Sequence, residues 1–176
     1  MLYQLYANSL YNYGSKFTAD KDLIKECIQE LFVTLWTRKN LLGEPLSVKN
    51  YLFKAFRLSL FKKGKLLQRQ SSYEETEHYD FNASLTIEET IIEGENNAEM
   101  QQRLQLTLNQ LTSRQREAIF LKFYEGLSYN EIAEVMNISV KGTYKVVARA
   151  IEALREKLSP EDFLLLFFLF SMKYFS

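Results

Sequence analysis

Cysteine and histidine are almost absent from this chain of 176 residues. The single cysteine, Cys27, cannot form an internal disulfide and suits a reducing compartment, so we expect a cytoplasmic protein. The single histidine, His78, has no second histidine or cysteine beside it, which argues against a metal site. Because the chain offers neither a Cys–His nor a Ser–His–Asp set, and no glycine-rich phosphate loop, we expect no enzyme and no cofactor.

Proline and glycine are also scarce, with two and six residues. Few positions therefore interrupt a helix, and no alternation of apolar and polar residues is long enough to predict a strand. Aromatic residues make up 14% of the chain, which is enough for two small cores. The start of the sequence shows no secretory signal. We predict an all-α fold with two small helical domains.

The net charge is zero, but the charges are unevenly distributed. Residues 1–70 carry twelve Lys/Arg against five Asp/Glu, a net charge of +7, whereas residues 71–102 carry nine Asp/Glu and no Lys/Arg, a net charge of −9. Residues 103–158 carry nine basic against six acidic side chains, a net charge of +3, and residues 159–176 carry one against two. This asymmetry predicts two basic domains, an acidic flexible linker between them and an apolar tail after them, with those boundaries. Such a linker could lie over the basic domains when nucleic acid is absent.

Residues 111–158 carry the strongest local signals, which predict three helices ending in a helix-turn-helix. Thr112 with Gln115, and Ser128 with Glu131, each fit a capping box, in which two side chains satisfy two helix-end amides. The remaining boundary signals are two residues that tolerate a left-handed backbone and one serine N-cap: Gly126, Asn137 and Ser139.

The last of these helices has two different faces. Its predicted buried stripe follows a spacing of three and four residues: Val140, Thr143, Val147, Ile151, Leu154 and Leu158. The opposite face carries side chains that suit contacts with phosphates and base edges: Lys141, Tyr144, Lys145 and Arg149. A helix that reads DNA in the major groove fits this pattern, and so does a solvated face on an ordinary three-helix bundle.

Residues 1–70 predict three further helices. The first covers residues 3–17, the second runs from an Asp20 cap to about Leu41 with Trp36 expected in the core, and the third follows a Ser47 cap. The third helix carries a basic stripe with aromatic rings between the cations, which suits unpaired bases and their backbone. Its cations are Lys49, Lys54, Arg57, Lys62, Lys63 and Lys65. The alternative is that the rings form the core and the lysines are only solvated.

These features together resemble a bacterial sigma factor of the extracytoplasmic-function (ECF) group of the sigma-70 family. In the second domain, the positions that match the family pattern L-P-x-x-Q-R-x-x-F-x-L-x-x-x-E-G-x-S-x-x-E-I-A-x-x-x-x-I-S include Leu111, Gln115, Arg116, Glu125, Gly126, Ser128, Glu131, Ile132, Ala133, Ile138 and Ser139. In the first domain, the segment ECIQELFVTLW resembles D-x-x-Q-[DE]-x-F-x-x-x-W, with Glu26, Gln29, Glu30, Phe32 and Trp36 at those places. The resemblance implies a region-2-like domain over residues 1–70 and a region-4-like domain over residues 103–158.

The resemblance also implies a set of roles. Core RNA polymerase would be bound by Glu26, Gln29, Glu30 and Phe32. The −10 promoter element would be engaged by Lys49, Asn50, Lys54, Arg57, Lys62 and Lys63. The −35 element would be read by Lys141, Tyr144, Lys145 and Arg149. An anti-sigma factor, which in this family can be membrane-anchored, would hold the protein inactive; no small-molecule substrate is implied.

The chain departs from the family pattern in three places. Leu58 stands where the family often has asparagine, and Lys62 where an acidic residue is common. Gly142, Thr143 and Tyr144 replace a common Thr-Val-Lys, so the promoter preferences of relatives are not transferred to this chain. The family also usually has a further helix before the equivalent of Leu2.

Two other functions fit the same residues. A self-contained dimeric helix-turn-helix regulator would bind a palindromic site tightly without polymerase. A helical protein-interaction module would show no salt-dependent association with DNA. The apolar run Phe163 to Phe170 is far shorter than the roughly 20 residues that span a bilayer, so we expect either a packed terminal helix or a partner interface.

Overall fold

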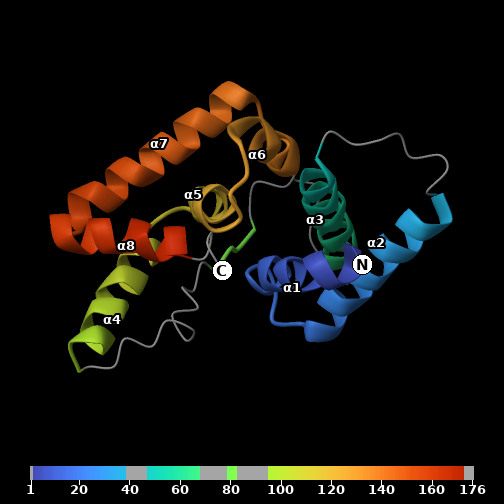
Figure 1. Cartoon of the computed structure of the whole chain (residues 1–176), viewed down its shortest axis with the longest axis horizontal. Helices are drawn as coiled ribbons and strands as arrows, with labels where there is room; N and C mark the ends of the chain where they lie inside the picture. Colours follow the sequence, from blue (N-terminus) through green and yellow to red (C-terminus); the bar gives the residue numbers. More distant parts are fainter. Residues whose placement is uncertain (1, 39–46, 68–78, 83–94, 173–176) are drawn as a thin grey trace. The chain divides into compact units, whose positions relative to one another are not determined.

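The computed structural model describes residues 2–38, 47–67, 79–82 and 95–172 (Figure 1). Every regular element in these residues is a helix, which confirms the predicted all-α fold. The chain divides into two compact units, Met1–Asp80 with Ala133–Asn137, and Phe81–Ile132 with Ile138–Ser176.

The first unit packs three helices against one another: α1 (Leu2–Ser15), α2 (Lys21–Arg38) and α3 (Val48–Leu67) (Figure 1). Two predicted caps are confirmed. Asp20 Oδ1 accepts hydrogen bonds from the amides of Asp22 (3.1 Å) and Leu23 (3.0 Å), and Ser47 Oγ accepts one from the Asn50 amide (3.2 Å). The core between the helices is rich in aromatic rings and includes Leu10, Tyr13, Ile24, Cys27, Leu52, Phe53 and Phe56.

Helices α1 and α3 approach closely at one glycine. Gly14 is buried, and a Cβ atom added to it would lie 2.8 Å from Phe56 Cζ and 3.0 Å from Ile24 Cγ2. Both distances are shorter than an ordinary carbon–carbon contact. The absence of a side chain at this position therefore allows the helices of the first unit to pack as they do.

The second unit contains the remaining helices: α4 (Glu95–Asn109), α5 (Ser113–Ile119), the π-helix η2 (Phe120–Tyr124), α6 (Tyr129–Met136), α7 (Val140–Lys157) and α8 (Pro160–Met172). Helix α5 packs on α7, while α8 packs on η2 and contacts α4 and α7. By this division, residues 129–132 of α6 are counted with the second unit and residues 133–136 with the first.

The local signals of the helix-turn-helix region are confirmed. Both capping boxes have both of their hydrogen bonds, Thr112 with Gln115 and Ser128 with Glu131. Gly126 has a φ of 69° and Asn137 a φ of 52°, so both adopt the left-handed backbone that was predicted at the helix ends.

Three features of this unit were not predicted. Helix α4 begins at Glu95, inside the segment 71–102 that was expected to be linker, and its Leu104 and Leu108 are buried. A π-helical turn, η2, follows α5 where one continuous helix was expected. Val140, the first residue of α7, is exposed although it was placed in the buried stripe.

Phe81, also within the expected linker, is anchored in the second unit. Its side chain is fully buried, edge-on to Phe120 at a centroid distance of 5.7 Å. Its carbonyl accepts a hydrogen bond from the guanidinium of Arg116, which also donates to the carbonyls of Asn109 and Leu111. Arg116, which matches the family pattern, therefore ties Phe81 and the end of α4 to α5.

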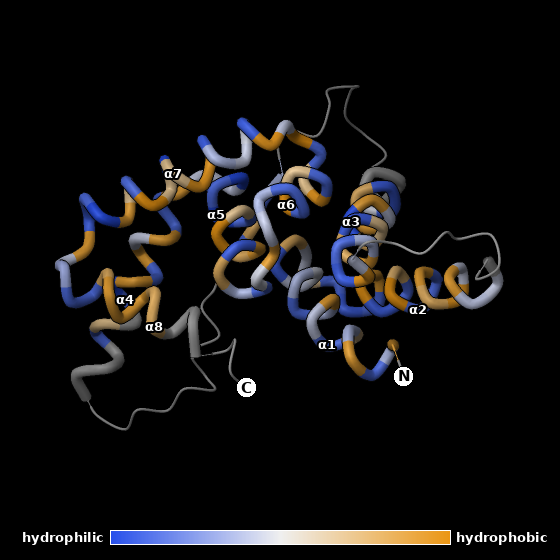
Figure 2. The backbone as a smooth tube through the Cα atoms, turned by 45° about the horizontal axis from the view of Figure 1, so that its top comes forward, coloured by the Kyte–Doolittle hydropathy of each residue, from blue (hydrophilic) through white to orange (hydrophobic). Residues whose placement is uncertain are grey.

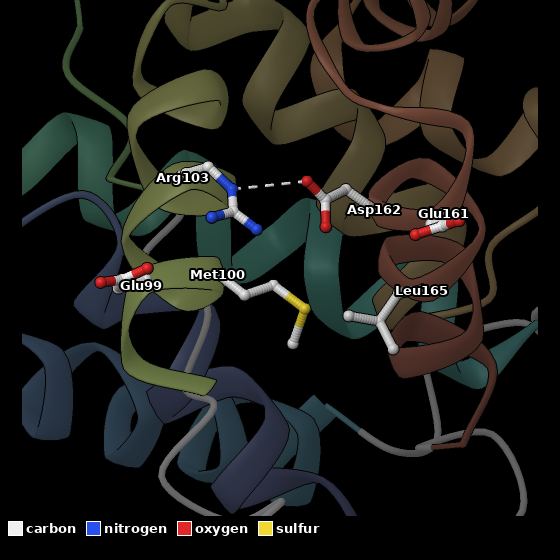
Figure 3. Close-up of a pocket in the computed structure, with 6 residues that line it drawn as sticks. All are labelled: Glu99, Met100, Arg103, Glu161, Asp162 and Leu165. Atoms are coloured by element: carbon white, nitrogen blue, oxygen red, sulfur yellow. Dashed lines mark ion pairs between the residues drawn. The ribbon is translucent and has the colours of Figure 1, made fainter. Parts of the chain in front are cut away.

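Within the apolar tail, α8 packs on η2, as expected of a packed terminal helix, whereas its Leu164 and Phe168 are exposed. Leu166 is fully buried, and Phe167 lies edge-on to Phe123 of η2 at 4.8 Å. None of the helices in the described part of the chain is both long enough and apolar enough to cross a membrane. A cavity of about 340 Å³ lies between α4 and α8, where Figure 3 shows Arg103 facing Asp162 in an ion pair of 3.5 Å.

Candidate nucleic-acid interface

The buried side of α7 fixes how this helix presents its other face. Ser139 Oγ accepts a hydrogen bond from the Gly142 amide (3.0 Å), as predicted for an N-cap, and the hydroxyl of Thr143 donates to the Ser139 carbonyl (3.2 Å). Along the helix, Thr143, Val147, Ala150 and Leu154 are buried. Figure 2 shows the alternation of hydrophobic and hydrophilic positions along α7 that results.

The four side chains predicted for −35 recognition are all exposed on α7: Lys141, Tyr144, Lys145 and Arg149. Two residues outside this set are linked to it by ring and cation contacts. The ring of Tyr144 stacks on that of Tyr129 at the start of α6, at 4.0 Å with an angle of 22° between the rings. The ammonium of Lys122 lies 4.7 Å from the centroid of Tyr129 and donates to the Leu127 carbonyl. Sequence analysis missed Lys122 and Tyr129 because contacts between η2, α6 and α7, and not local periodicity, bring these side chains together with Tyr144.

The predicted polymerase-binding residues lie on α2. Glu26, Gln29 and Glu30 are exposed and share one face, since residues three and four apart are neighbours on a helix. Phe32 is half-buried and lies edge-on to Tyr3 of α1, at 5.1 Å and 68°. Three predicted residues therefore form one polar surface, and the fourth packs beside it.

The expectation that Trp36 lies in the core is wrong. Its side chain is 74% exposed, and Val33 is also exposed. The buried stripe of α2 runs through Ile24, Cys27 and Leu31, whereas Val33 and Trp36 follow Gln29 at intervals of four and seven. Trp36 and Val33 thus add an apolar area beside the polar surface. Their spacing from Gln29 was the signal in the sequence that could have placed Trp36 on this exposed face.

The residues predicted for −10 recognition are distributed along α3 in different environments. Lys54 and Lys62 are exposed, and Asn50 is half-buried. Lys49 is also half-buried, with its ammonium 5.6 Å from the centroid of Phe53. The members of this set are therefore not equally available to DNA.

Arg57 is the least accessible of the set, at 7% exposure. Its guanidinium carbon lies 4.5 Å from the centroid of Phe61 and 5.4 Å from that of Tyr79, and Phe17 packs on both rings. Tyr79 belongs to the acidic segment that follows the first domain. In this conformation the segment covers Arg57 with an aromatic ring, so Tyr79 would have to leave before Arg57 could contact DNA.

Lys63 is paired with two residues of the predicted polymerase surface. Its Nζ lies 2.8 Å from Glu26 Oε1 and 2.7 Å from Glu30 Oε1. Burial lowers the pKa of Lys63, but the hydrogen bonds and negative charges of the two glutamates outweigh burial, so the pKa lies above its ordinary value of 10.5. The structure therefore joins one predicted −10 residue to two predicted polymerase contacts.

Cys27 lies in the core beneath this cluster. Burial raises the pKa of its thiol, although a hydrogen bond from Ser59 and the charge of Lys63 act in the opposite direction. A buried thiol with a raised pKa is unreactive at neutral pH, so Cys27 is a core residue. Across the residues that the structure describes, no three His, Cys, Asp or Glu side chains gather closely enough to hold a metal ion.

Comparison with known proteins gives consistent relatives. The family model described as "Sigma-70, region 4" matches residues 101–154. The ECF RNA polymerase sigma factor SigM of Bacillus subtilis (strain 168) is 27% identical over 154 residues, which cover 88% of this chain and 91% of SigM. The ECF RNA polymerase sigma factor SigX of the same organism is 25% identical over 174 residues, which cover 92% of this chain and 88% of SigX.

Two solved structures share the fold. One is the sigma factor RpoE in complex with the anti-sigma factor NepR from Bartonella quintana, with a TM-score of 0.56, 19% identity, and coverage of 88% of this chain and 92% of RpoE. The other is CnrH in complex with the cytosolic domain of CnrY, with a TM-score of 0.54, 19% identity, and coverage of 88% and 83%.

Proposed function

We propose that this chain, a sigma factor of the ECF group of the sigma-70 family, directs core RNA polymerase to specific promoters and catalyses no reaction itself. The observation that carries the proposal is the region-4 match over residues 101–154, which contains the exposed basic face of α7. The similarity to SigM and SigX extends over most of the chain and so includes the first unit.

In the proposed complex, α7 lies in the major groove of the −35 element. A major groove admits one α-helix, and the N-terminal residues of a recognition helix reach the base edges. Lys141 and Lys145 suit phosphates, while Arg149 suits either phosphate or guanine. The stack of Tyr129 on Tyr144 would hold the Tyr144 ring in place against the DNA. We expect the first two turns of α7 to contact base edges, and residues farther along the helix to contact the DNA backbone.

The exposed face of α2 is the proposed polymerase-binding surface. Glu26, Gln29 and Glu30 supply charge and hydrogen-bonding groups that suit a basic partner. Trp36 and Val33 supply an apolar part at the same surface, and exposed tryptophans are frequent anchors of protein interfaces. We include Trp36 in this surface in place of its expected core role.

The proposed −10 contacts lie along α3. Lys54 and Lys62 are exposed and suit the phosphates of a melted strand. Lys49 and Asn50, half-buried at the start of α3, would contribute from one end. Arg57 would contribute only after Tyr79 has moved from its ring contact.

We also propose that an anti-sigma protein controls this chain. The support is the fold shared with RpoE, which was solved bound to the anti-sigma factor NepR, and with CnrH, which was solved bound to the cytosolic domain of CnrY.

Co-purification with core RNA polymerase tests the main proposal. The full chain is compared with a variant carrying Glu30→Lys and Gln29→Ala, and with a control carrying Glu156→Lys, a reversal at an exposed position near the end of α7. We expect stoichiometric binding of the wild type and the control, and loss of binding by the α2 variant. If the folded wild type does not bind, the sigma-factor proposal fails, and tight binding to genomic DNA fragments would favour the self-contained regulator.

A further inference from the structure

The ion-pair cluster on the first unit joins the two helices to which we assign different roles. Lys63 comes from α3, and Glu26 and Glu30 stand one helical turn apart on α2. The ammonium binds Oε1 of both carboxylates, at 2.8 and 2.7 Å.

The three side chains differ in their access to solvent. The Lys63 side chain is only 20% exposed, whereas those of Glu26 and Glu30 are 60% and 55% exposed. The ammonium therefore belongs to a side chain that is mostly covered, whereas the two glutamates that it binds remain more than half exposed. The raised pKa of Lys63 keeps the ammonium charged throughout the physiological pH range.

A bridge of this kind changes what the glutamates lose when a partner binds. An unrestrained glutamate loses rotamer freedom on binding, which weakens the complex. A glutamate that is already held by Lys63 has lost part of that freedom in the unbound protein. Its exposed carboxylate can then bind a lysine or arginine of the partner with a smaller loss of side-chain entropy.

We propose that Lys63 is a positioning residue of the polymerase-binding surface and not a DNA contact. By bridging Glu26 and Glu30, it holds their exposed carboxylates in place for basic side chains of core RNA polymerase. This inference rests on the proposed function, and it reassigns Lys63 from the −10 set.

Simple charge arithmetic predicts the opposite effect, which makes the proposal easy to test. Lys63 is positive and lies within the surface that would meet a basic partner. If only net charge mattered, removal of Lys63 would make the surface more acidic and would strengthen polymerase binding. Positioning predicts that the same removal weakens binding, so the sign of the change decides between the two.

The experiment measures the affinity of the full-length chain for core RNA polymerase without DNA, by fluorescence anisotropy in competition with labelled wild type. The variants are Lys63→Met, Lys63→Arg and the control Lys21→Met, which removes an exposed lysine at the start of α2. We expect Lys63→Met to weaken binding roughly tenfold, because Glu26 and Glu30 would then have to lose their side-chain entropy when the polymerase binds. We expect Lys63→Arg to bind like the wild type, because arginine can also bridge two carboxylates, and Lys21→Met to bind like the wild type as well.

A second background distinguishes positioning from a general loss of structure. In a chain carrying Glu26→Gln and Glu30→Gln, the bridge has no carboxylates to hold, so Lys63→Met should have no further effect on affinity. If Lys63→Met does not fold, Lys63→Gln replaces it.

Two results would overturn the inference: binding by Lys63→Met that equals or exceeds that of the wild type, or a further loss in the glutamine background. Failure of the wild type itself to bind would instead refute the proposed function.

Discussion

The close contact between α1 and α3 leads to a quantitative prediction for two glycines. An alanine Cβ at Gly14 would stand 2.8 Å from Phe56 Cζ and 3.0 Å from Ile24 Cγ2. Both neighbours are fully or almost fully buried, so the added Cβ would contact side chains of the core and not side chains that extend into solvent. At Gly64, in α3, an added Cβ would have no neighbour within 4 Å.

The two substitutions share one favourable effect and differ in one unfavourable effect. Alanine is better than glycine in a helix by up to about 1 kcal/mol, so Gly64→Ala should stabilise the first unit by about that amount. Gly14→Ala has the same favourable effect, but overpacking of a dense core costs about 1–3 kcal/mol. We therefore expect Gly14→Ala to be about 1–3 kcal/mol less stable than Gly64→Ala.

Amide hydrogen exchange followed by mass spectrometry measures this difference within the first unit. Because 1.4 kcal/mol corresponds to a factor of ten, the slowest amides of α1, α2 and α3 should exchange about 5 to 150 times faster in Gly14→Ala than in Gly64→Ala. The amides of α7, in the second unit, serve as an internal reference. Equal protection of the two variants would show that α1 and α3 do not meet at Gly14, and the described packing of the first unit would be wrong.

Three further predictions concern the interfaces and their support. Lys145→Ala and Arg149→Ala should each reduce −35-dependent transcription, and each should lower the slope of log affinity against log salt by about 0.9 if it removes a phosphate contact; unchanged slopes and transcription for both would remove α7 from the DNA interface. Leu154→Ala, at a fully buried position of α7, should destabilise the second unit by about 2–5 kcal/mol in a urea titration, and a loss below about 0.5 kcal/mol would contradict its burial. The folded pKa of Lys63 lies above the lysine value of 10.5, so its stabilising contribution is complete below that pH and is lost as the pH rises through the higher folded value. The stability difference between wild type and Lys63→Met should therefore be constant between pH 7 and about pH 10 and decrease above 10.5, and a difference that grows in that range would contradict the ion pair.

Local sequence determined the helices and most of their ends. The caps at Asp20, Ser47, Thr112, Ser128 and Ser139 were predicted and are present in the structure. Each consists of hydrogen bonds between residues two or three positions apart, so no distant part of the chain is needed to form it. The left-handed positions at Gly126 and Asn137 are local in the same way.

The same local rules failed where burial depends on a partner helix. Trp36 is a large apolar residue of the kind expected in a core, but no helix covers its side of α2 in the described structure. Arg57 is a charged residue of the kind expected at the surface, but the rings of Phe61 and Tyr79 cover it. Helix α4 has a polar start without a capping signal, and packing of Leu104 and Leu108 within the second unit gives it a buried face.

Tertiary structure alone decided how the candidate sites are connected. The sequence places Lys63 among basic residues of α3, and Glu26 and Glu30 in an acidic motif more than thirty positions earlier. Only the packing of α2 on α3 brings the ammonium within 2.8 Å of both carboxylates. Sequence analysis could identify which side chains are charged and which helix carries them, because these are properties of single residues and of local periodicity. It could not identify their ion-pair partners, because pairing depends on the distance between atoms of different helices.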